Sequence, residues 1–138
     1  MERIRRGFST LLIMGAVAWQ PFAARGEDSA GPLLCAPTTI VSCQPDGKCE
    51  RETTESVDLP RFLKVDIANS RISGTRASGQ ALTAAIGKVD RVEGATILQG
   101  VEGDLMWNLM ISEGARDMTI TAGGDNVGFV AFGACTQE

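Results

Sequence analysis

The sequence contains no histidine and no tyrosine among its 138 residues. Without histidine, no imidazole can act as a general base, activate a serine or cysteine nucleophile, or bind a metal. The serine motifs G-x-S-x-G and S-x-x-K are also missing. We therefore predict no catalytic, cofactor-binding or metal-binding residue, and a non-catalytic protein. The enzymatic alternative is a hydrolase that works with a pair of carboxylates, although no such pair stands out.

Basic and aromatic residues are few. The chain has 13 Lys and Arg against 17 Asp and Glu, a net charge of −4, and its aromatic residues are five Phe and two Trp. A negatively charged protein repels phosphate backbones, and so few aromatic rings make a poor platform for stacked bases. We predict that the protein does not bind nucleic acid.

The longest apolar run, residues 11–19 (LLIMGAVAW), is too short to span a bilayer. Three arginines precede it: Arg3, Arg5 and Arg6. Basic residues, a short apolar run and then small residues at positions 24 and 26 are typical of a cleaved export signal. We predict a signal peptide at residues 1–26 and a single domain at residues 27–138.

The general secretory route is favoured for this signal, and the twin-arginine route is possible. Arg5-Arg6-Gly7-Phe8 resembles the core of a twin-arginine signal, but Ile4 replaces the usual Ser or Thr. A lipoprotein anchor is rejected because Leu34 is too large for the position before Cys35. We expect a soluble, monomeric protein in the periplasm or outside the cell, without a stable membrane anchor.

Short apolar or alternating runs separated by turn residues predict an all-β domain. The expected strands cover residues 33–43, 48–57, 62–68, a short stretch around 72, 82–91, 96–101, 105–112, 118–121 and 127–135. Leu82–Arg91 also fits a short helix, but Gly87 and the neighbouring valines favour a strand. Eight or nine strands in a meander must protect their edges, which predicts a single small up-and-down barrel, closed or nearly closed. A two-sheet β-sandwich is the alternative.

Four cysteines in an exported chain predict disulfides. Pro45-Asp46-Gly47 suits a three-residue hairpin loop, which places Cys43 directly opposite Cys49. The remaining pair is Cys35–Cys135, and it ties the first strand to the last. No C-x-x-C spacing and no histidine support a metal site instead.

Several groups could carry chemistry, but each has a simpler structural interpretation. Asp66 shares a strand face with Lys64 and fits a solvated outer face. Glu50-Arg51-Glu52 and Glu102-Gly103-Asp104 lack the ligand spacing of a calcium loop. Gly123–Gly128 is glycine-rich, but the strand expected after it predicts a hairpin rather than a phosphate-binding loop.

Trp107, Met106 and Met110 could line a ligand pocket, although a Trp in an alternating strand is more often part of the core. The alternation places Leu105, Trp107, Leu109 and Ile111 on one face of the strand.

The chain resembles a set of small exported bacterial proteins of unknown function. The residues that carry this resemblance are Cys35, Cys43, Cys49, Leu59-Pro60, Phe62, Asp66, Gln99-Gly100-Val101, Trp107, Met118, Gly128-Phe129 and Phe132-Gly133-Ala134-Cys135. These are structural positions, so the resemblance implies a cysteine-braced β domain and no catalytic residue. We expect the domain to bind either a small apolar ligand or an exported protein partner. An inhibitor-type interaction module is the alternative.

Overall fold

The computed structural model describes residues 31–114 and 116–138. The predicted signal peptide and the first residues of the predicted domain lie outside the described residues. The described part is all-β and contains ten strands and no helix. The strands are β1 (Leu33–Cys43), β2 (Cys49–Glu52), β3 (Leu63–Asp66), β4 (Arg71–Thr75), β5 (Ala81–Ala85), β6 (Lys88–Val92), β7 (Ala95–Glu102), β8 (Leu105–Ser112), β9 (Asp117–Gly124) and β10 (Val127–Gln137).

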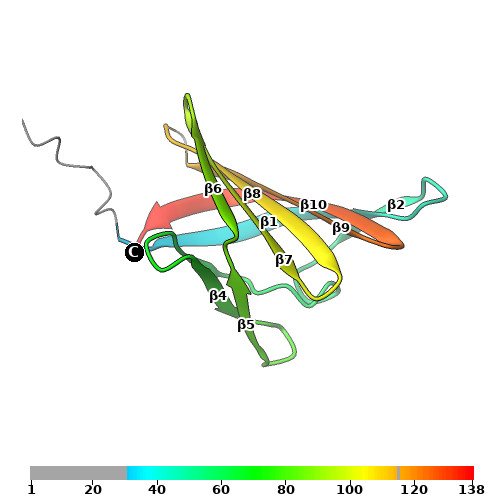
Figure 1. Ribbon diagram of the computed structural model, residues 1–138. Coiled ribbons are helices and arrows are strands. Elements are labelled where there is room, and N and C mark those ends of the chain that lie inside the picture. The colour runs from blue at the N-terminus through cyan, green and yellow to red at the C-terminus, as the bar shows by residue number, and fades with distance from the viewer. Residues whose placement is uncertain (1–30, 115) are drawn as a thin grey trace, which may run out of the picture.

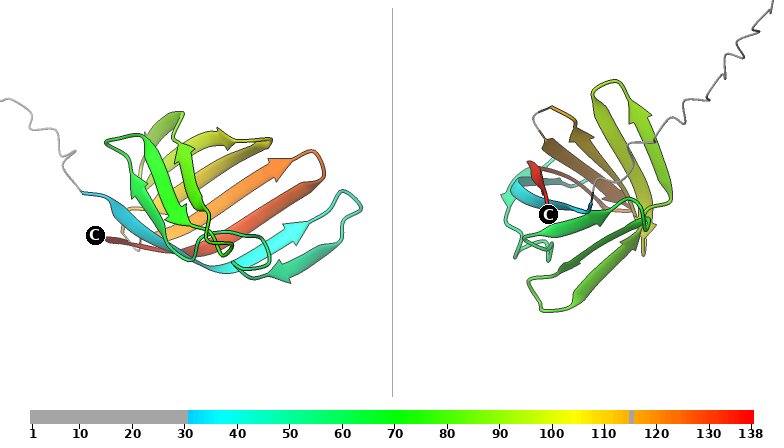
Figure 2. Two further views of the ribbon diagram at one scale, coloured as in Figure 1. Left: turned by 90° about the horizontal axis from the view of Figure 1, so that it is seen from below. Right: turned by 90° about the vertical axis from the view of Figure 1, so that its left-hand side faces the viewer.

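All ten strands belong to one antiparallel sheet with the order β5-β4-β3-β1-β10-β9-β8-β7-β6, and β2 pairs with β1 beside this path. The sheet curls strongly into a half-barrel, which is open rather than closed but nearly barrel-like (Figures 1 and 2). This confirms the predicted meander and nearly closed barrel over the two-sheet sandwich. The order departs from a simple meander where the first strand, β1, pairs with the last, β10.

The two ends of the sheet belong to one bent segment of chain. β5 pairs with β4 and β6 pairs with β7, and only Ile86-Gly87 separates β5 from β6. At the bend, the Ile86 N–H donates to the Ser70 carbonyl (2.9 Å) and the Gly87 N–H donates to the Gln99 carbonyl (2.8 Å). The segment Leu82–Arg91 is therefore strand, as favoured, but it forms two strands and brings the total to ten.

The predicted strand at residues 48–57 is too long, because β2 ends at Glu52. Thr53 and Ser56 then exchange hydrogen bonds between their backbone N–H groups and side-chain hydroxyls, at 3.0 and 3.1 Å. Side chains of this kind offer the backbone an alternative to the ladder of a sheet, so the chain turns where the sequence pattern suggested a continued strand.

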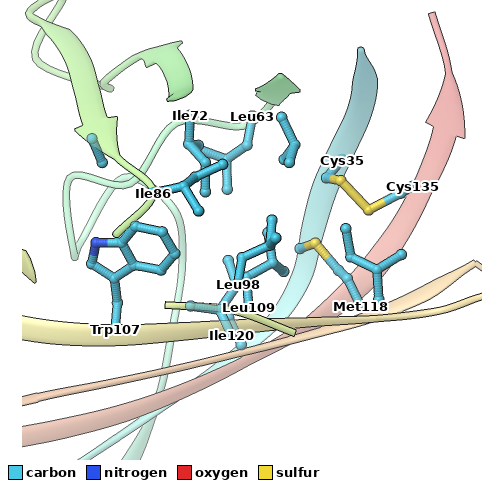
Figure 3. Packing of buried hydrophobic residues seen from close by; sticks show 14 of the residues in the cluster. Cys35, Leu63, Ile72, Ile86, Leu98, Trp107, Leu109, Met118, Ile120 and Cys135 are labelled. Atoms are coloured by element: carbon cyan, nitrogen blue, oxygen red, sulfur yellow. A yellow bond between two sulfur atoms is a disulfide. The ribbon is translucent and has the colours of Figure 1, made fainter. Parts of the chain in front are cut away.

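The core fills the concave side of the half-barrel. Strands alternate between buried and exposed positions, for example Leu82 and Ala84 on β5 and Trp107, Leu109 and Ile111 on β8. Such alternation lets one face of an antiparallel sheet be apolar while the other meets water. Figure 3 shows Trp107 near one end of this cluster and the Cys35–Cys135 disulfide near the other.

Both predicted disulfides are present. Cys43–Cys49 joins paired positions on β1 and β2, and its hairpin loop has the expected form: the Gln44 N–H donates to the Lys48 carbonyl (2.9 Å), and Gly47 has φ of 86°. Cys35–Cys135 joins paired positions on β1 and β10 across 100 residues of sequence. Two disulfides indicate folding in an oxidising environment.

Candidate functional site

The half-barrel has two openings, one on each side of the β5–β6 bend. Residues of β5 line the first, and a residue of β6 lines the second. We call the first the tryptophan pocket and the second the end cavity. A third candidate, the outer face, is the convex side of β7, β8, β9, β10 and β1.

The tryptophan pocket is apolar and almost full. Trp107 is 9% exposed and packs among Leu63, Ile72 and Leu82. The free volume beside it is about 70 Å³, whereas ligand pockets usually measure about 300–1,000 Å³. The Trp107 Nε1–H is buried and has no hydrogen-bond partner among the described residues. This side of the half-barrel is a core with a small gap.

Gly100 makes room for the indole ring. Gly100 pairs with Trp107 across β7 and β8. A Cβ atom at Gly100 would lie 2.3 Å from Trp107 Cζ2 and 2.5 Å from the Ala85 carbonyl oxygen. These separations are shorter than any real carbon contact, so the buried position of Trp107 requires glycine opposite it.

A set of polar groups, which we call the latch, ties the loops over the tryptophan pocket together. The Arg76 guanidinium, in the β4–β5 turn, forms an ion pair with Glu102 at the end of β7. Arg76 also donates to the Asp58 carbonyl oxygen (3.2 Å), and the Asp58 carboxylate accepts from the Ser78 N–H (2.9 Å) and hydroxyl (3.0 Å). The latch links the β2–β3 loop, the β4–β5 turn and the end of β7, and Glu102 lines one edge of the pocket.

The end cavity is larger and mixed in character, with a volume of about 400 Å³. Its buried wall includes the apolar side chains of Val65 and Ile111 together with Thr96, which is 8% exposed. Its exposed rim carries charged side chains: Arg91, Glu113 and Arg116. No sequence pattern pointed to this cavity, because its lining comes from β1, β3, β6, β7, β8 and β10.

The outer face presents the side chains that point away from the core. Four of them are large, apolar and exposed: Val101 (62%), Met106 (67%), Met110 (45%) and Phe132 (48%). Between them, the Gln99 side-chain amide donates to Asn108 Oδ1 (2.8 Å), and the Asn108 amide donates to Thr121 Oγ1 (3.4 Å). Among the outward positions of these five described strands, Asp117 at the start of β9 is the one charged residue.

The two methionines do not lie with Trp107. Met106 and Met110 alternate with Trp107 along β8, so they point to the outer face while the indole ring points into the core. The hypothesis that these three side chains line one pocket is wrong, and the interpretation of Trp107 as a core residue is confirmed. The glycine-rich segment 123–128 forms the β9–β10 hairpin with Asp125-Asn126 as its turn, as predicted.

The acidic candidates serve turns and loops. Asp66 accepts hydrogen bonds from the Asn69 side-chain amide (2.8 Å) and N–H (3.1 Å), and these bonds lower the pKa of Asp66. Lys64 pairs with Glu138 at 2.5 Å.

Glu52 accepts from the hydroxyls of Ser56 (2.6 Å) and Ser42 (2.9 Å), and these bonds lower its pKa. In the part of the chain that the structure describes, no three His, Cys, Asp or Glu side chains gather as a metal site.

Comparisons with family models, curated proteins and solved structures found no match for this chain. Within residues 31–114 and 116–138, no helix has the length and apolar character needed to cross a membrane.

Proposed function

We propose that this protein is an exported, non-catalytic domain that binds a protein partner through its outer face. The observation that carries the proposal is a five-stranded sheet face on which large apolar side chains are exposed and charge is confined to one corner. The four side chains form two pairs, Val101 with Met106 and Met110 with Phe132, on either side of the Gln99–Asn108–Thr121 row. Exposed large apolar side chains grouped on one face and interleaved with polar groups are typical of protein interaction sites. The two disulfides support export because they form in oxidising compartments.

Binding of a small apolar ligand inside the barrel is the weaker possibility. The gap beside Trp107 measures about 70 Å³, well below the roughly 300–1,000 Å³ of usual ligand pockets. The tryptophan pocket is therefore a packed core rather than a ligand site.

The size of the outer face suits a protein partner. Five strands at a spacing of about 4.8 Å, with about eight residues at 3.4 Å each, give a face of roughly 650 Å² before side-chain relief is added. A standard protein interface covers about 800 Å² on each partner. The outer face is therefore large enough for most of such an interface.

The chemistry of the partner follows from the border of the face. Asp104 and Asp125 lie at the ends of the strands near Met106, and Asp117 lies at the opposite end of β9. The end of the face beside Met106 is therefore acidic, whereas Lys88 on β6, Lys64 on β3 and Arg51 on β2 flank its sides. An acidic end on such a face is complementary to an apolar patch that carries lysine or arginine at one end. We propose an exported protein with such a patch as the partner.

Photo-crosslinking in the producing cells tests this proposal. A photoreactive amino acid at Met106 or Val101 is expected to give one defined heterodimeric adduct. The same amino acid at Thr83, an exposed position on β5, is the matched control and is expected to give none. The adduct at Met106 should disappear when Phe132→Asp is also introduced, and its yield should fall as salt is raised.

Three results would contradict the proposal: no adduct at Met106 and Val101, equal adducts at Thr83, or an adduct formed only between two copies of this chain. Mass spectrometry of the adduct identifies the partner and the partner residues in contact. Acidic rather than basic residues at that contact would also count against it.

A further inference from the structure

We propose that Met106 and Met110 make the outer face a reversible oxidation switch. Hydrogen peroxide converts both side chains to methionine sulfoxide, and the protein partner then binds more weakly. This switch rests on the proposed function, because it regulates binding at the same surface. Three observations support it: where the methionines lie, how exposed they are, and which other side chains could react with the oxidant.

The methionines differ sharply in exposure. Residues 31–138 contain three of them. Met106 and Met110 on β8 are 67% and 45% exposed, whereas Met118 on the neighbouring strand β9 is 1% exposed. An oxidant reaches a sulfur atom through solvent, so the two methionines of the outer face should react first. Met118 then serves as an internal reference.

The strands beside β8 leave Met106 uncovered. Its paired residue on β9 is Gly123, which has no side chain, and its paired residue on β7 is Val101, which is itself 62% exposed. Neither neighbour can shield the thioether of Met106 from solvent. Met106 is accordingly the most exposed of the four large apolar side chains of the outer face.

Few other side chains compete for the oxidant. A cysteine thiolate is normally the most reactive target in a protein, but all four cysteines of this chain are in disulfides. The chain has no histidine or tyrosine, and Trp107 is 9% exposed. The two thioethers of the outer face are therefore the most accessible groups that a two-electron oxidant can modify.

The reaction needs hydrogen peroxide as its single co-reactant. A lone pair of the sulfur attacks one peroxide oxygen, an S–O bond forms while the O–O bond breaks, and the other oxygen leaves as water after proton transfer. The sulfur loses two electrons and the peroxide gains them. A flexible apolar side chain thereby becomes a polar sulfoxide. An apolar partner patch would have to strip water from that oxygen, which weakens the complex.

Brief treatment of the purified protein with hydrogen peroxide tests the first step. Peptide mass spectrometry over time is expected to show the added oxygen at Met106 and Met110 roughly tenfold or more faster than at Met118. Methionine sulfoxide reductases of both stereospecificities should remove it again. Equal rates at the three methionines would overturn the switch and leave the proposed function standing.

Photo-crosslinking tests the effect on the partner. Purified protein with a photoreactive amino acid at Val101 is added to the exported fraction of the producing cells as untreated, oxidised, or oxidised and then repaired protein. Oxidation is expected to lower the yield of the heterodimeric adduct at least about fivefold, and repair should restore it. An unchanged yield after full oxidation would overturn the switch alone. No adduct from the untreated protein would contradict the proposed function and the switch together.

Matched variants assign the response to the two sulfur atoms, each variant being compared with its own untreated sample. Met106→Leu/Met110→Leu keeps apolar side chains of similar volume without an exposed thioether, so its adduct yield should be the same with and without peroxide. The control is Met118→Leu, which removes the buried methionine and should leave the fall in adduct yield intact. A fall that persists in the double variant would assign it to another group and overturn the switch.

Discussion

The half-barrel has an opening on each side of the β5–β6 bend, and the two differ in content. On the β5 side, Trp107 fills the space and the latch ties the surrounding loops together. On the β6 side, inward positions carry Arg91 and Thr96, and about 400 Å³ stays open. The same sheet therefore builds a packed core at one end and an accessible cavity at the other.

The difference arises from side-chain size and polarity at paired inward positions. Gly100 opposite Trp107 lets an aromatic ring lie flat against β7. Arg91 opposite Thr96 places two polar side chains in the lining of the end cavity on the other side of the bend.

Removal of the Cys35–Cys135 disulfide should have the largest effect on stability. This bond closes a loop of 100 residues, and the chain-entropy relation gives a loss of about 4–5 kcal/mol for Cys35→Ala/Cys135→Ala. The loss for Cys43→Ala/Cys49→Ala should be about 2 kcal/mol because its loop spans six residues. Denaturant unfolding of both variants checks the order, and a larger loss from the short loop would contradict it.

The Cys35–Cys135 bond also lies next to the end cavity. Leu33 and Gln137, two residues beyond the cysteines on β1 and β10, line that cavity. Loss of this disulfide should therefore lower the hydrogen-exchange protection of the Glu113 N–H, which donates to the Gly94 carbonyl beside the end cavity, whereas loss of Cys43–Cys49 should leave that protection unchanged.

Truncation of Trp107 should make the two openings alike. Trp107→Ala removes a buried aromatic ring and is expected to cost about 3–5 kcal/mol of unfolding free energy. It should also create an apolar cavity that binds 1-anilinonaphthalene-8-sulfonate and raises its fluorescence. Met106→Ala, the exposed neighbour on β8, is the control and should change stability by less than about 0.5 kcal/mol. An unchanged probe signal would mean that the surrounding strands collapse into the space.

Addition of one methyl group at Gly100 should disturb the packed opening alone. Gly100→Ala forces the indole ring or β5 to move and is expected to cost about 1–3 kcal/mol. Gly128→Ala is the matched control, because a Cβ atom there meets its nearest neighbour at an ordinary 3.9 Å. Thermal unfolding compares the two variants, and equal stabilities would show that Trp107 adapts without cost.

Structural features that depend on residues close together in the sequence were predictable. The bounds of β1 and β8 match the predicted runs because alternation and turn residues are local. The Cys43–Cys49 pairing follows from the Pro45-Asp46-Gly47 loop, and Cys35–Cys135 follows by elimination. The division of residues 82–91 into two strands could not be predicted. The bend at Gly87 depends on the hydrogen bond from its N–H to the Gln99 carbonyl on β7, and the sequence around Gly87 does not show this contact.

The candidate sites were much harder to predict than the strands. Arg76 and Glu102 are 26 residues apart and lie in segments that look like ordinary solvated loops. The end cavity combines residues of six strands, and its arginines appear dispersed along the chain. Only the outer face had a local signal, since Met106 and Met110 alternate with core residues on β8, and that signal was first assigned to a pocket.

Disruption of the latch should have a smaller effect than loss of packing. The Arg76 and Glu102 side chains are 24% and 36% exposed, so solvent weakens their attraction and Glu102→Gln should cost about 0.5–1 kcal/mol. The expected sign of loosening is faster quenching of Trp107 fluorescence by acrylamide. Asp104→Gln, a nearby exposed acid outside the latch, should change neither quantity. If both variants quench alike, the latch does not cover the pocket.

The smallest expected effect is a response to acid at the packed opening. Hydrogen bonds from Arg61 lower the pKa of Glu55 to about 2. A carboxyl group whose pKa is lower in the folded state contributes stability that is present above its ordinary pKa of 4.5 and is lost as pH falls towards 2. Glu55 lies in the loop that carries Leu59 to the tryptophan pocket, so this loop should loosen over that range.

Hydrogen exchange can compare the acid response of the loop at the tryptophan pocket with that of the chain beside the end cavity. The Leu59 N–H donates to the Thr54 carbonyl (2.8 Å) within the loop, and the Glu113 N–H donates to the Gly94 carbonyl (2.9 Å) beside the end cavity. Between pH 4.5 and 2.5, protection of the Leu59 amide should fall relative to that of the Glu113 amide, after correction for intrinsic rates. In Glu55→Gln, Leu59 protection should already be lower at pH 6 and should not fall further with acid. A fall of equal size in both proteins would assign the acid response to the whole domain rather than to the loop that covers Trp107.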